Sequence, residues 1–165
     1  MIAQQFSALE KEALLQITND PFLVISYSQF GEDTLIAEFL SAHKFVNRPK
    51  FYVDIGSYHP SRFSNAKLLR FLGWKGTNVD PNPDCIKLFQ EARPADINLN
   101  VGVSSKCGHA DLYCFREGAV NTFDEESAQA LRRKGWIFLG RRRVPLLTLN
   151  KLLDEYLPDE VKNTG

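Results

Sequence analysis

The sequence predicts an α/β fold, in which an incomplete Rossmann-like parallel sheet follows N-terminal helices. A short apolar run at residues 51–55 carries Asp54 near its end and is followed by Gly56, and a second run at 77–79 is followed by Asp80. A helical segment separates the two runs. This order is the opening β-α-β unit of a nucleotide pocket, with a glycine-dependent turn and an acidic residue roughly twenty residues further on.

Two helices are expected before the first strand. Residues 5–17 predict an amphipathic helix whose apolar side holds Phe6, Leu9, Ala13, Leu14 and Ile17. A second helix is expected at 31–43, and its inward-facing side chains are expected to be Leu35, Ile36, Phe39 and Leu40. We therefore divide the chain into an N-terminal helical segment, 1–48, and a partial Rossmann-like domain, 49–165.

Strands and helices continue to alternate after the first strand, which argues for an α/β chain. Gly73 is well placed as the C′ residue of a helix over 61–72, and Asn82 with Pro83 begins a helix through residue 92. The run at 97–103 predicts a third strand, paired as an antiparallel hairpin with 109–115. The remaining expected elements are a helix at 123–134, a strand at 142–146 and a helix at 149–156.

Charge and composition exclude several classes of protein. The 20 basic residues balance the 20 acidic ones, so no overall field favours nucleic acid or a membrane as partner. There is no apolar run of about eighteen residues and no signal-peptide pattern, which predicts a cytoplasmic protein. The cysteines Cys85, Cys107 and Cys114 lack C-x-x-C spacing, as expected of reduced thiols.

The turn after the first strand contains a single glycine, and this limits the ligand. A dinucleotide pocket uses G-x-G-x-x-G so that bare backbone can approach the pyrophosphate, but here the bulky Tyr58, His59 and Pro60 follow Gly56. No G-x-x-x-x-G-K-[ST] motif occurs, which argues against a nucleotide triphosphatase. S-adenosylmethionine carries no phosphate and needs only a close backbone approach and a carboxylate for its ribose hydroxyls. Because Gly56 and Asp80 suit these roles, the sequence predicts this cofactor.

Each candidate contact also has a simpler structural explanation. Asp54 and Gly56 stand at the carboxyl end of a strand, where ligands bind in open α/β sheets, but they could be a capping aspartate and a turn glycine. Asp80 could accept hydrogen bonds from both ribose hydroxyls, or it could form an Asx turn ahead of Pro81. Ser57 could contact the methionine carboxylate or cap the following helix.

Five motifs, taken in order, resemble the FkbM-type S-adenosylmethionine-dependent methyltransferases, which are class I enzymes. The motifs are Ser28-Gln29-Phe30-Gly31-Glu32-Asp33, Val53-Asp54-Ile55-Gly56, Asp80-Pro81-Asn82-Pro83, Asn98-Leu99-Asn100-Val101-Gly102-Val103-Ser104 and Asn121-Thr122-Phe123. The resemblance covers residues 27–157. It implies a class I methyltransferase sheet and O-methylation of a hydroxyl on a sugar or natural product.

The resemblance also adds two residues to the expected cofactor contacts. It implies that Gln29 belongs to the lid or floor of the cofactor site, whereas without it Ser28 is a helix N-cap. Asn100 lies near the end of the third strand, where the adenine edge is expected to pass, although a buried asparagine could instead satisfy loop backbone. The full set of expected cofactor contacts is Gln29, Asp54, Gly56, Ser57, Asp80 and Asn100.

The resembling family continues beyond the segment similar to 144–157 with a strand that carries an Asp-x-Glu-Gly type motif. This chain ends before such a strand, so we expect a truncated domain whose open sheet edge invites self-association. One alternative function is therefore a truncated, non-catalytic binding domain. Another is an anion- or RNA-binding module that uses the basic segment 132–143, although a solvated basic face explains that segment more simply.

Neither a catalytic residue nor a metal site is assigned from the sequence. His59 is the histidine beside the expected pocket and is a candidate base for a hydroxyl acceptor. A histidine that hydrogen-bonds its own turn is nevertheless the favoured interpretation. Cys107, His109 and Cys114 match no standard zinc spacing, so no metal site is predicted.

Overall fold

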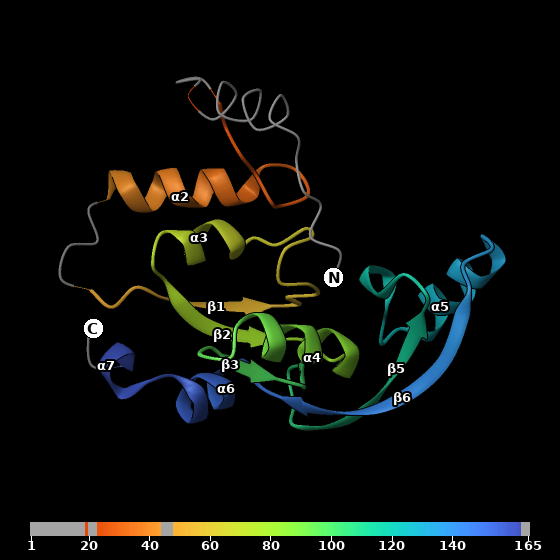
Figure 1. Cartoon of the computed structure of the whole chain (residues 1–165). Coiled ribbons are helices and arrows are strands. Elements are labelled where there is room, and N and C mark those ends of the chain that lie inside the picture. The colour runs from red at the N-terminus through yellow and green to blue at the C-terminus, as the bar shows by residue number, and fades with distance from the viewer. Residues whose placement is uncertain (1–18, 20–22, 44–47, 163–165) are drawn as a thin grey trace.

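A computed structural model describes residues 19, 23–43 and 48–162 of the 165-residue chain. The helix predicted at 5–17 lies outside the described residues. Within them, the chain forms an α/β structure with a small parallel sheet and a second, mixed sheet, which confirms the predicted class (Figure 1). No helix among the described residues is long and apolar enough to cross a membrane.

The parallel sheet has three strands in the order β1-β2-β3, which is also their order in the chain. Strand β1 is Phe51–Ile55, β2 is Lys75–Val79 and β3 is Ile97–Leu99. Helix α3 (Lys67–Phe71) connects the first pair and α4 (Pro83–Ala92) the second. Since both connections are parallel crossovers that advance in the same direction, both helices are expected on one face of the sheet. The carboxyl ends of the three strands therefore share one edge.

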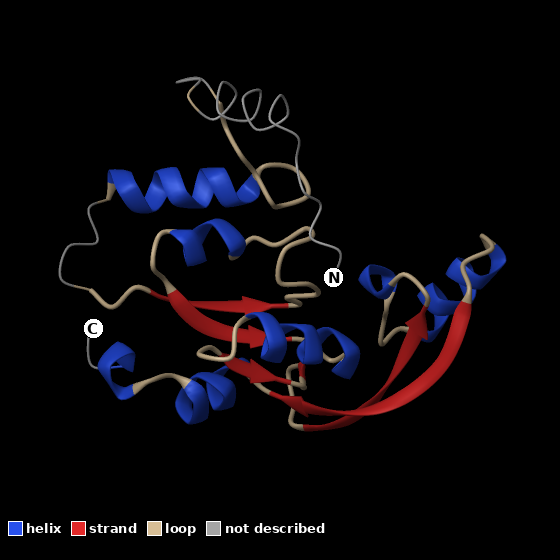
Figure 2. Cartoon of the chain, viewed as in Figure 1, coloured by secondary structure: helices blue, strands red, loops and turns tan. Residues whose placement is uncertain are grey.

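The second sheet has the order β4-β6-β5 and forms a long arm (Figure 2). Strand β4 is Gly102–Val103, β5 is Gly108–Phe115 and β6 is Phe138–Leu147, with η1 (Gly118–Val120) and α5 (Glu125–Arg133) between β5 and β6. We call residues 108–147 the arm. Figure 1 shows the arm extending past the carboxyl ends of β1, β2 and β3.

The hairpin predicted between 97–103 and 109–115 is wrong. The expected strand splits into β3 and β4, because Asn100 turns away and donates from Nδ2 to the Asp80 carbonyl at 3.0 Å. Strand β5 then pairs antiparallel with β6 along its whole length, while β4 pairs parallel with β6. The longer β6 offers a continuous partner that the two-residue β4 cannot match.

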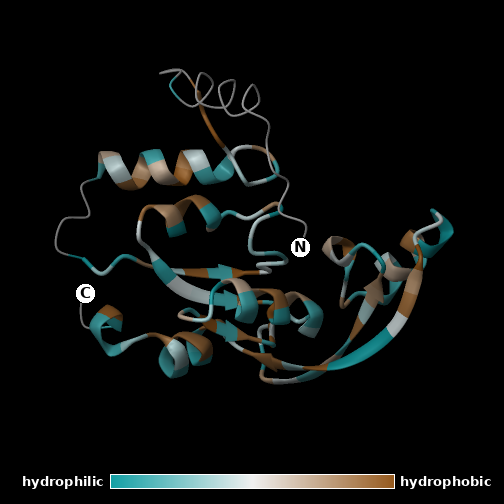
Figure 3. Ribbon diagram, viewed as in Figure 1, coloured by the Kyte–Doolittle hydropathy of each residue, from teal (hydrophilic) through white to brown (hydrophobic). Residues whose placement is uncertain are grey.

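Helix α2 (Glu32–Ala42) confirms the helix predicted at 31–43, but its expected inward face is wrong. Leu35, Ile36 and Phe39 are 67%, 37% and 55% exposed, and only Leu40 of the expected set packs against the core. The fully buried residue of this helix is Asp33. Figure 3 shows several hydrophobic segments along α2.

The helix predicted at 61–72 begins later than expected, at Lys67. Two residues before it adopt left-handed backbone angles, Tyr58 at φ 51° and Phe63 at φ 56°, which are incompatible with a continuous helix. The end of the helix is as predicted: Gly73 has φ 84°, and the amides of Gly73 and Trp74 donate to the Arg70 and Leu69 carbonyls. This is a Schellman arrangement.

The other local predictions are confirmed with small shifts of their ends. Asn82 caps α4 by accepting from the Asp84 amide, with Pro83 at the first helical position. The predicted strands 77–79 and 142–146 lie within the longer β2 and β6. Helix α5 lies within the predicted range 123–134, α6 is Leu149–Tyr156 as predicted, and α7 (Asp159–Lys162) was not anticipated.

Because Gly76 has no side chain, the Tyr52 ring can lie directly against its backbone in the parallel sheet. A Cβ added at Gly76 would overlap the Tyr52 ring, with Cδ2 and Cζ both at 2.5 Å. Tyr52 in turn packs with Ala66 and Leu69, which lie before and within α3. We expect Gly76→Ala to lower the free energy of unfolding by about 1–3 kcal/mol, the range for overpacking a core. Urea denaturation checks this, and Gly108→Ala, at an open position on the arm, is the matched control.

Candidate functional site

The turn after β1 is held against β2 and leaves space beside its glycine. The amides of Gly56 and Ser57 both donate to the Val79 carbonyl, at 2.8 and 3.1 Å. Gly56 has φ 76°, and no atom lies within 4 Å of where its Cβ would stand. The Ser57 side chain is buried, and its Oγ donates to the same carbonyl at 3.4 Å. Ser57 therefore neither caps a helix nor presents its hydroxyl to solvent.

Asp80, after β2, organises two turns with its carboxylate. Its Oδ2 accepts from the Tyr58 amide at 2.9 Å and its Oδ1 from the Asn82 amide at 2.8 Å. The second bond is the Asx turn that the sequence allowed as the simpler explanation. Burial raises the pKa of Asp80, and the two amides oppose that shift. Each oxygen still has a second lone pair, so the Asx turn does not prevent contact with a ligand.

Asp54 differs from Asp80 because its carboxylate forms no hydrogen bond with any described residue. It lies in register with Asn78 on the neighbouring strand, two positions before Gly56. Burial raises its pKa, the Arg93 guanidinium lowers it, and the nearby Asp80 raises it further. The carboxyl edge of the sheet thus holds two neighbouring carboxylates, one of them without a donor.

Asn100 joins this group, but Gln29 does not. Asn100 donates to the Asp80 carbonyl, which is the loop-backbone role that the sequence left open. Gln29 is exposed, and its side chain forms no hydrogen bond with any described residue. The structure therefore brings together Asp54, Gly56, Ser57, Asp80 and Asn100.

The loop around Gln29 is organised by Asp33, a residue that sequence reasoning left without a role. Asp33 accepts from the hydroxyls of Ser26 (2.5 Å) and Ser28 (2.8 Å) and from the Tyr27 amide (2.7 Å). These bonds lower its pKa although burial opposes them. The loop is bonded to the segment before α3 through Tyr27, whose carbonyl accepts from the Ser64 amide at 3.0 Å. The hydrogen bonds to Asp33 therefore give Ser28 and Asp33 of the 28–33 motif a structural role in closing the loop.

A buried arginine, which the sequence analysis did not single out, supports the loop that follows β1. Arg93 follows α4 and donates from Nη2 to the Pro60 carbonyl (2.5 Å) and Ser64 Oγ (3.1 Å). Its Nη1 donates to Tyr52 Oη at 2.9 Å, and that hydroxyl donates to Asp96 at 2.7 Å. A single arginine after a helix gives no sign in sequence of which distant groups it will reach. The network ties β1 and the loop after it to the end of α4.

Tyr58 connects the turn to the arm. Its Oη donates to Glu117 Oε1 at 2.5 Å, and Arg62 approaches the other Glu117 oxygen at 3.3 Å. Burial and the Glu117 carboxylate raise the pKa of Tyr58 to about 12, whereas the Tyr58 bond lowers the pKa of Glu117. Glu117 was not predicted, because it lies far from the turn in sequence.

His59 plays the structural role that the sequence favoured. Its Nδ1 lies 3.0 Å from the Ser61 nitrogen and 2.9 Å from the Arg62 nitrogen, and both amides donate to it. A neutral imidazole that accepts at Nδ1 carries its proton at Nε2, so no basic nitrogen remains for a substrate. Burial and the charges of Arg62 and Arg93 lower its pKa.

The cysteines form no metal site among the described residues, and several side chains of the basic segment are engaged by other residues. All three cysteines are free thiols, and the described residues contain no group of three or more potential metal ligands. In segment 132–143, Arg142 pairs with Asp84 at 2.9 Å, and the Arg132 and Arg141 guanidinium groups lie over the Phe138 and Tyr113 rings. These contacts explain several basic side chains without a nucleic acid.

Comparison with known proteins adds no further constraint. A scan against protein-family models, a search of curated proteins and a search of solved structures each returned no match to this chain.

Proposed function

We propose that the chain is a Rossmann-like, class I domain that binds S-adenosylmethionine and methylates a hydroxyl group. The observation that carries the proposal is the Asp54 carboxylate, which lies beside Gly56 and Asp80 and has no hydrogen-bond partner among the described residues. Two neighbouring carboxylates would repel a pyrophosphate, but they suit a ligand with an ammonium, a sulfonium and ribose hydroxyls. The residues present therefore fit this cofactor better than a dinucleotide.

The cofactor supplies a methyl group already activated on sulfur, so the protein's own task is alignment and exclusion of water. Asp54 is free to accept from the ammonium of the methionine part, and the open space at Gly56 permits close approach of the ligand. Asp80 keeps one lone pair on each oxygen for the ribose hydroxyls. Ser57 and Asn100 act by fixing the turn and the Asp80 backbone, and Gln29 stays outside this set.

Calorimetric titration with S-adenosylhomocysteine, the product form, tests the proposal. Saturable one-to-one binding with little dependence on salt supports it. A folded sample that shows no binding contradicts it. Binding without methyl transfer to any hydroxyl acceptor would identify the alternative, a non-catalytic binding domain, while steep salt dependence toward polyanions would favour the anion-binding alternative.

Asp80→Ala is expected to weaken binding of S-adenosylhomocysteine and also to destabilise the protein. The substitution leaves the Tyr58 and Asn82 amides without their acceptor, and an unsatisfied donor costs about 1–3 kcal/mol. Titration and urea denaturation of the same sample measure both effects. Asp84→Ala, on the exposed first turn of α4, is the control; unchanged affinity in Asp80→Ala would remove the ribose assignment.

A further inference from the structure

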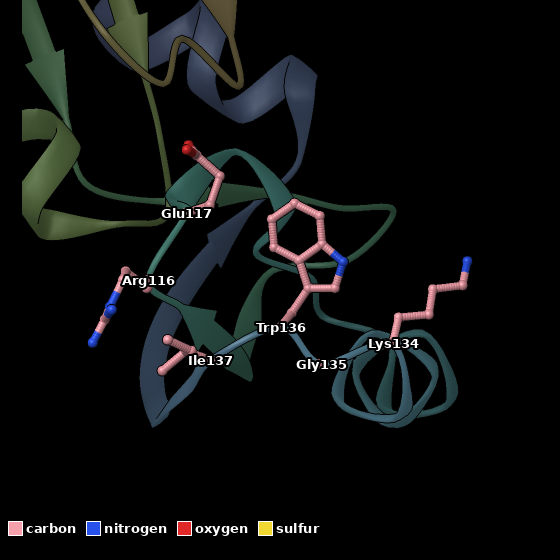
Figure 4. Close-up of a pocket in the computed structure, with 6 residues that line it drawn as sticks. All are labelled: Arg116, Glu117, Lys134, Gly135, Trp136 and Ile137. Atoms are coloured by element: carbon pink, nitrogen blue, oxygen red, sulfur yellow. The ribbon is translucent and has the colours of Figure 1, made fainter.

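A cavity of about 380 Å³ opens on the arm, outside the site already described. It is formed where the chain leaves β5 and where it passes from α5 into β6. Its lining residues are Arg116, Glu117, Lys134, Gly135, Trp136 and Ile137 (Figure 4). This volume lies within the range of sites for small molecules, about 300–1,000 Å³.

The walls of the cavity are held by backbone hydrogen bonds. Gly135 has φ 87° and ends α5, with the amides of Gly135 and Trp136 donating to the Arg132 and Leu131 carbonyls. This Schellman arrangement sets the direction of the 134–136 wall. The Arg116 amide donates to the Ile137 carbonyl at 2.9 Å and joins the two walls. The cavity is therefore built from fixed backbone.

The cavity lining combines an apolar surface with charged side chains, of which some have partners and others have none among the described residues. Trp136 is 41% exposed and Ile137 is 47% exposed, so large apolar side chains face the opening. The Glu117 carboxylate is already compensated by Arg62 and Tyr58. By contrast, the Lys134 and Arg116 side chains have no ion pair or hydrogen bond with any described residue. The cavity therefore presents an indole and uncompensated positive charge.

Figure 4 shows the Trp136 indole between the Glu117 and Lys134 side chains. A ring lying on the indole could thus meet a carboxylate on one side and an ammonium on the other. Glu117 also connects the cavity to the turn, because it accepts from Tyr58, whose own amide donates to Asp80. A Cβ at Gly118 would lie 3.4 Å from Asn82 and 3.5 Å from Tyr58, so the residue after Glu117 packs closely on the same turn.

We infer that this cavity binds a hydroxylated ring that carries an anionic group, either a phosphate or a carboxylate. The apolar C–H face of such a ring packs on the Trp136 indole, its hydroxyls donate to Glu117, and its anionic group pairs with Lys134. Binding at the cavity does not depend on the proposed function.

Calorimetric titrations with four probes test the inference: a hexose 6-phosphate, a hexuronate, the uncharged parent hexose and inorganic phosphate. We expect one of the two anionic sugars to bind saturably and at least tenfold more tightly than either the parent hexose or phosphate. Lys134→Gln should weaken that binding about tenfold, as expected for loss of a charge-assisted hydrogen bond, and Trp136→Ala should remove it. Lys151→Gln, an exposed lysine on α6, should change nothing.

The possible outcomes separate this inference from the proposed function. Binding of no anionic sugar, equal binding of inorganic phosphate, or affinity unchanged in both Lys134→Gln and Trp136→Ala each overturns the inference. Because S-adenosylhomocysteine is titrated separately, its failure to bind overturns only the proposed function. Trp136→Phe keeps an aromatic ring and should retain measurable binding, which guards against misfolding as the cause of a loss.

Discussion

Asp54→Asn is expected to remove most of the affinity for S-adenosylhomocysteine while raising the stability of the free protein at pH 7. The carboxylate has no hydrogen-bond donor among the described residues, so its charge is available to a cationic ligand group. A charge-assisted hydrogen bond contributes about 1.5–3 kcal/mol, which corresponds to a roughly 10- to 100-fold loss of affinity. Titration calorimetry of both proteins measures the change.

The stability gain should depend on pH in a defined direction. Burial raises the pKa of Asp54, so the folded protein holds this proton to higher pH than the unfolded chain does. The wild type therefore loses stability as pH rises through the folded pKa, and the amide variant does not. Urea denaturation at several pH values should show an advantage of Asp54→Asn at pH 7 that shrinks as the solution is acidified.

Asp111→Asn is the matched control for Asp54→Asn. Asp111 lies on β5, partly exposed, and its only ion pair is to Arg143 at 3.9 Å among the described residues. Neither affinity for S-adenosylhomocysteine nor the pH dependence of stability should change in this variant. If Asp54→Asn retains full affinity, or is less stable than the wild type at pH 7, the role assigned to the Asp54 carboxylate is wrong.

Arg93→Ala is expected to lower the free energy of unfolding by about 3–5 kcal/mol, the range for removing one member of a buried charged network. The guanidinium is buried and contacts four partners from three parts of the chain: Tyr52, Asn78, the Pro60 carbonyl and Ser64. Its loss removes a donor from each of these acceptors and a positive charge from near the Asp54 carboxylate. Urea denaturation monitored by tryptophan fluorescence measures the effect.

Two further variants distinguish the Arg93 network from a general effect of charge. Arg93→Lys keeps the charge but cannot span both sides of the network with one ammonium, so most of the loss should remain. Arg133→Ala removes an exposed arginine from α5 and should leave stability within about 0.5 kcal/mol of the wild type. A small effect of Arg93→Ala would mean that water replaces the guanidinium in the network.

Local chemistry predicted the candidate site better than it predicted the roles of individual residues. Gly56 and the two aspartates were placed correctly at one edge of the sheet, because the carboxyl ends of neighbouring parallel strands must meet there. Ser57 and Asn100 also lie at this edge but hold backbone. Gln29 was attached to the site by resemblance alone, and in the structure its side chain forms no hydrogen bond with any described residue.

Features that depend on a few consecutive residues were predicted correctly from the amino-acid sequence. The glycine after α3 and the Asn82 cap follow from local backbone preferences, which act over one turn of chain. The hairpin partner of β5 and the inward face of α2 did not follow, since both depend on which distant surface is available.

Which polar groups meet in the folded protein depends on how distant segments of the chain pack together. The Arg93 network, the contact of Tyr58 with Glu117 and the cavity at Trp136 join segments separated by tens of residues, as in the pairs Arg93–Tyr52 and Tyr58–Glu117. Buried polar groups must find hydrogen-bond partners, but a sequence does not state which partners the packed chain will bring within reach. Folding removes these polar groups from water, and each one then bonds to whichever partner the packing of the whole chain places within reach.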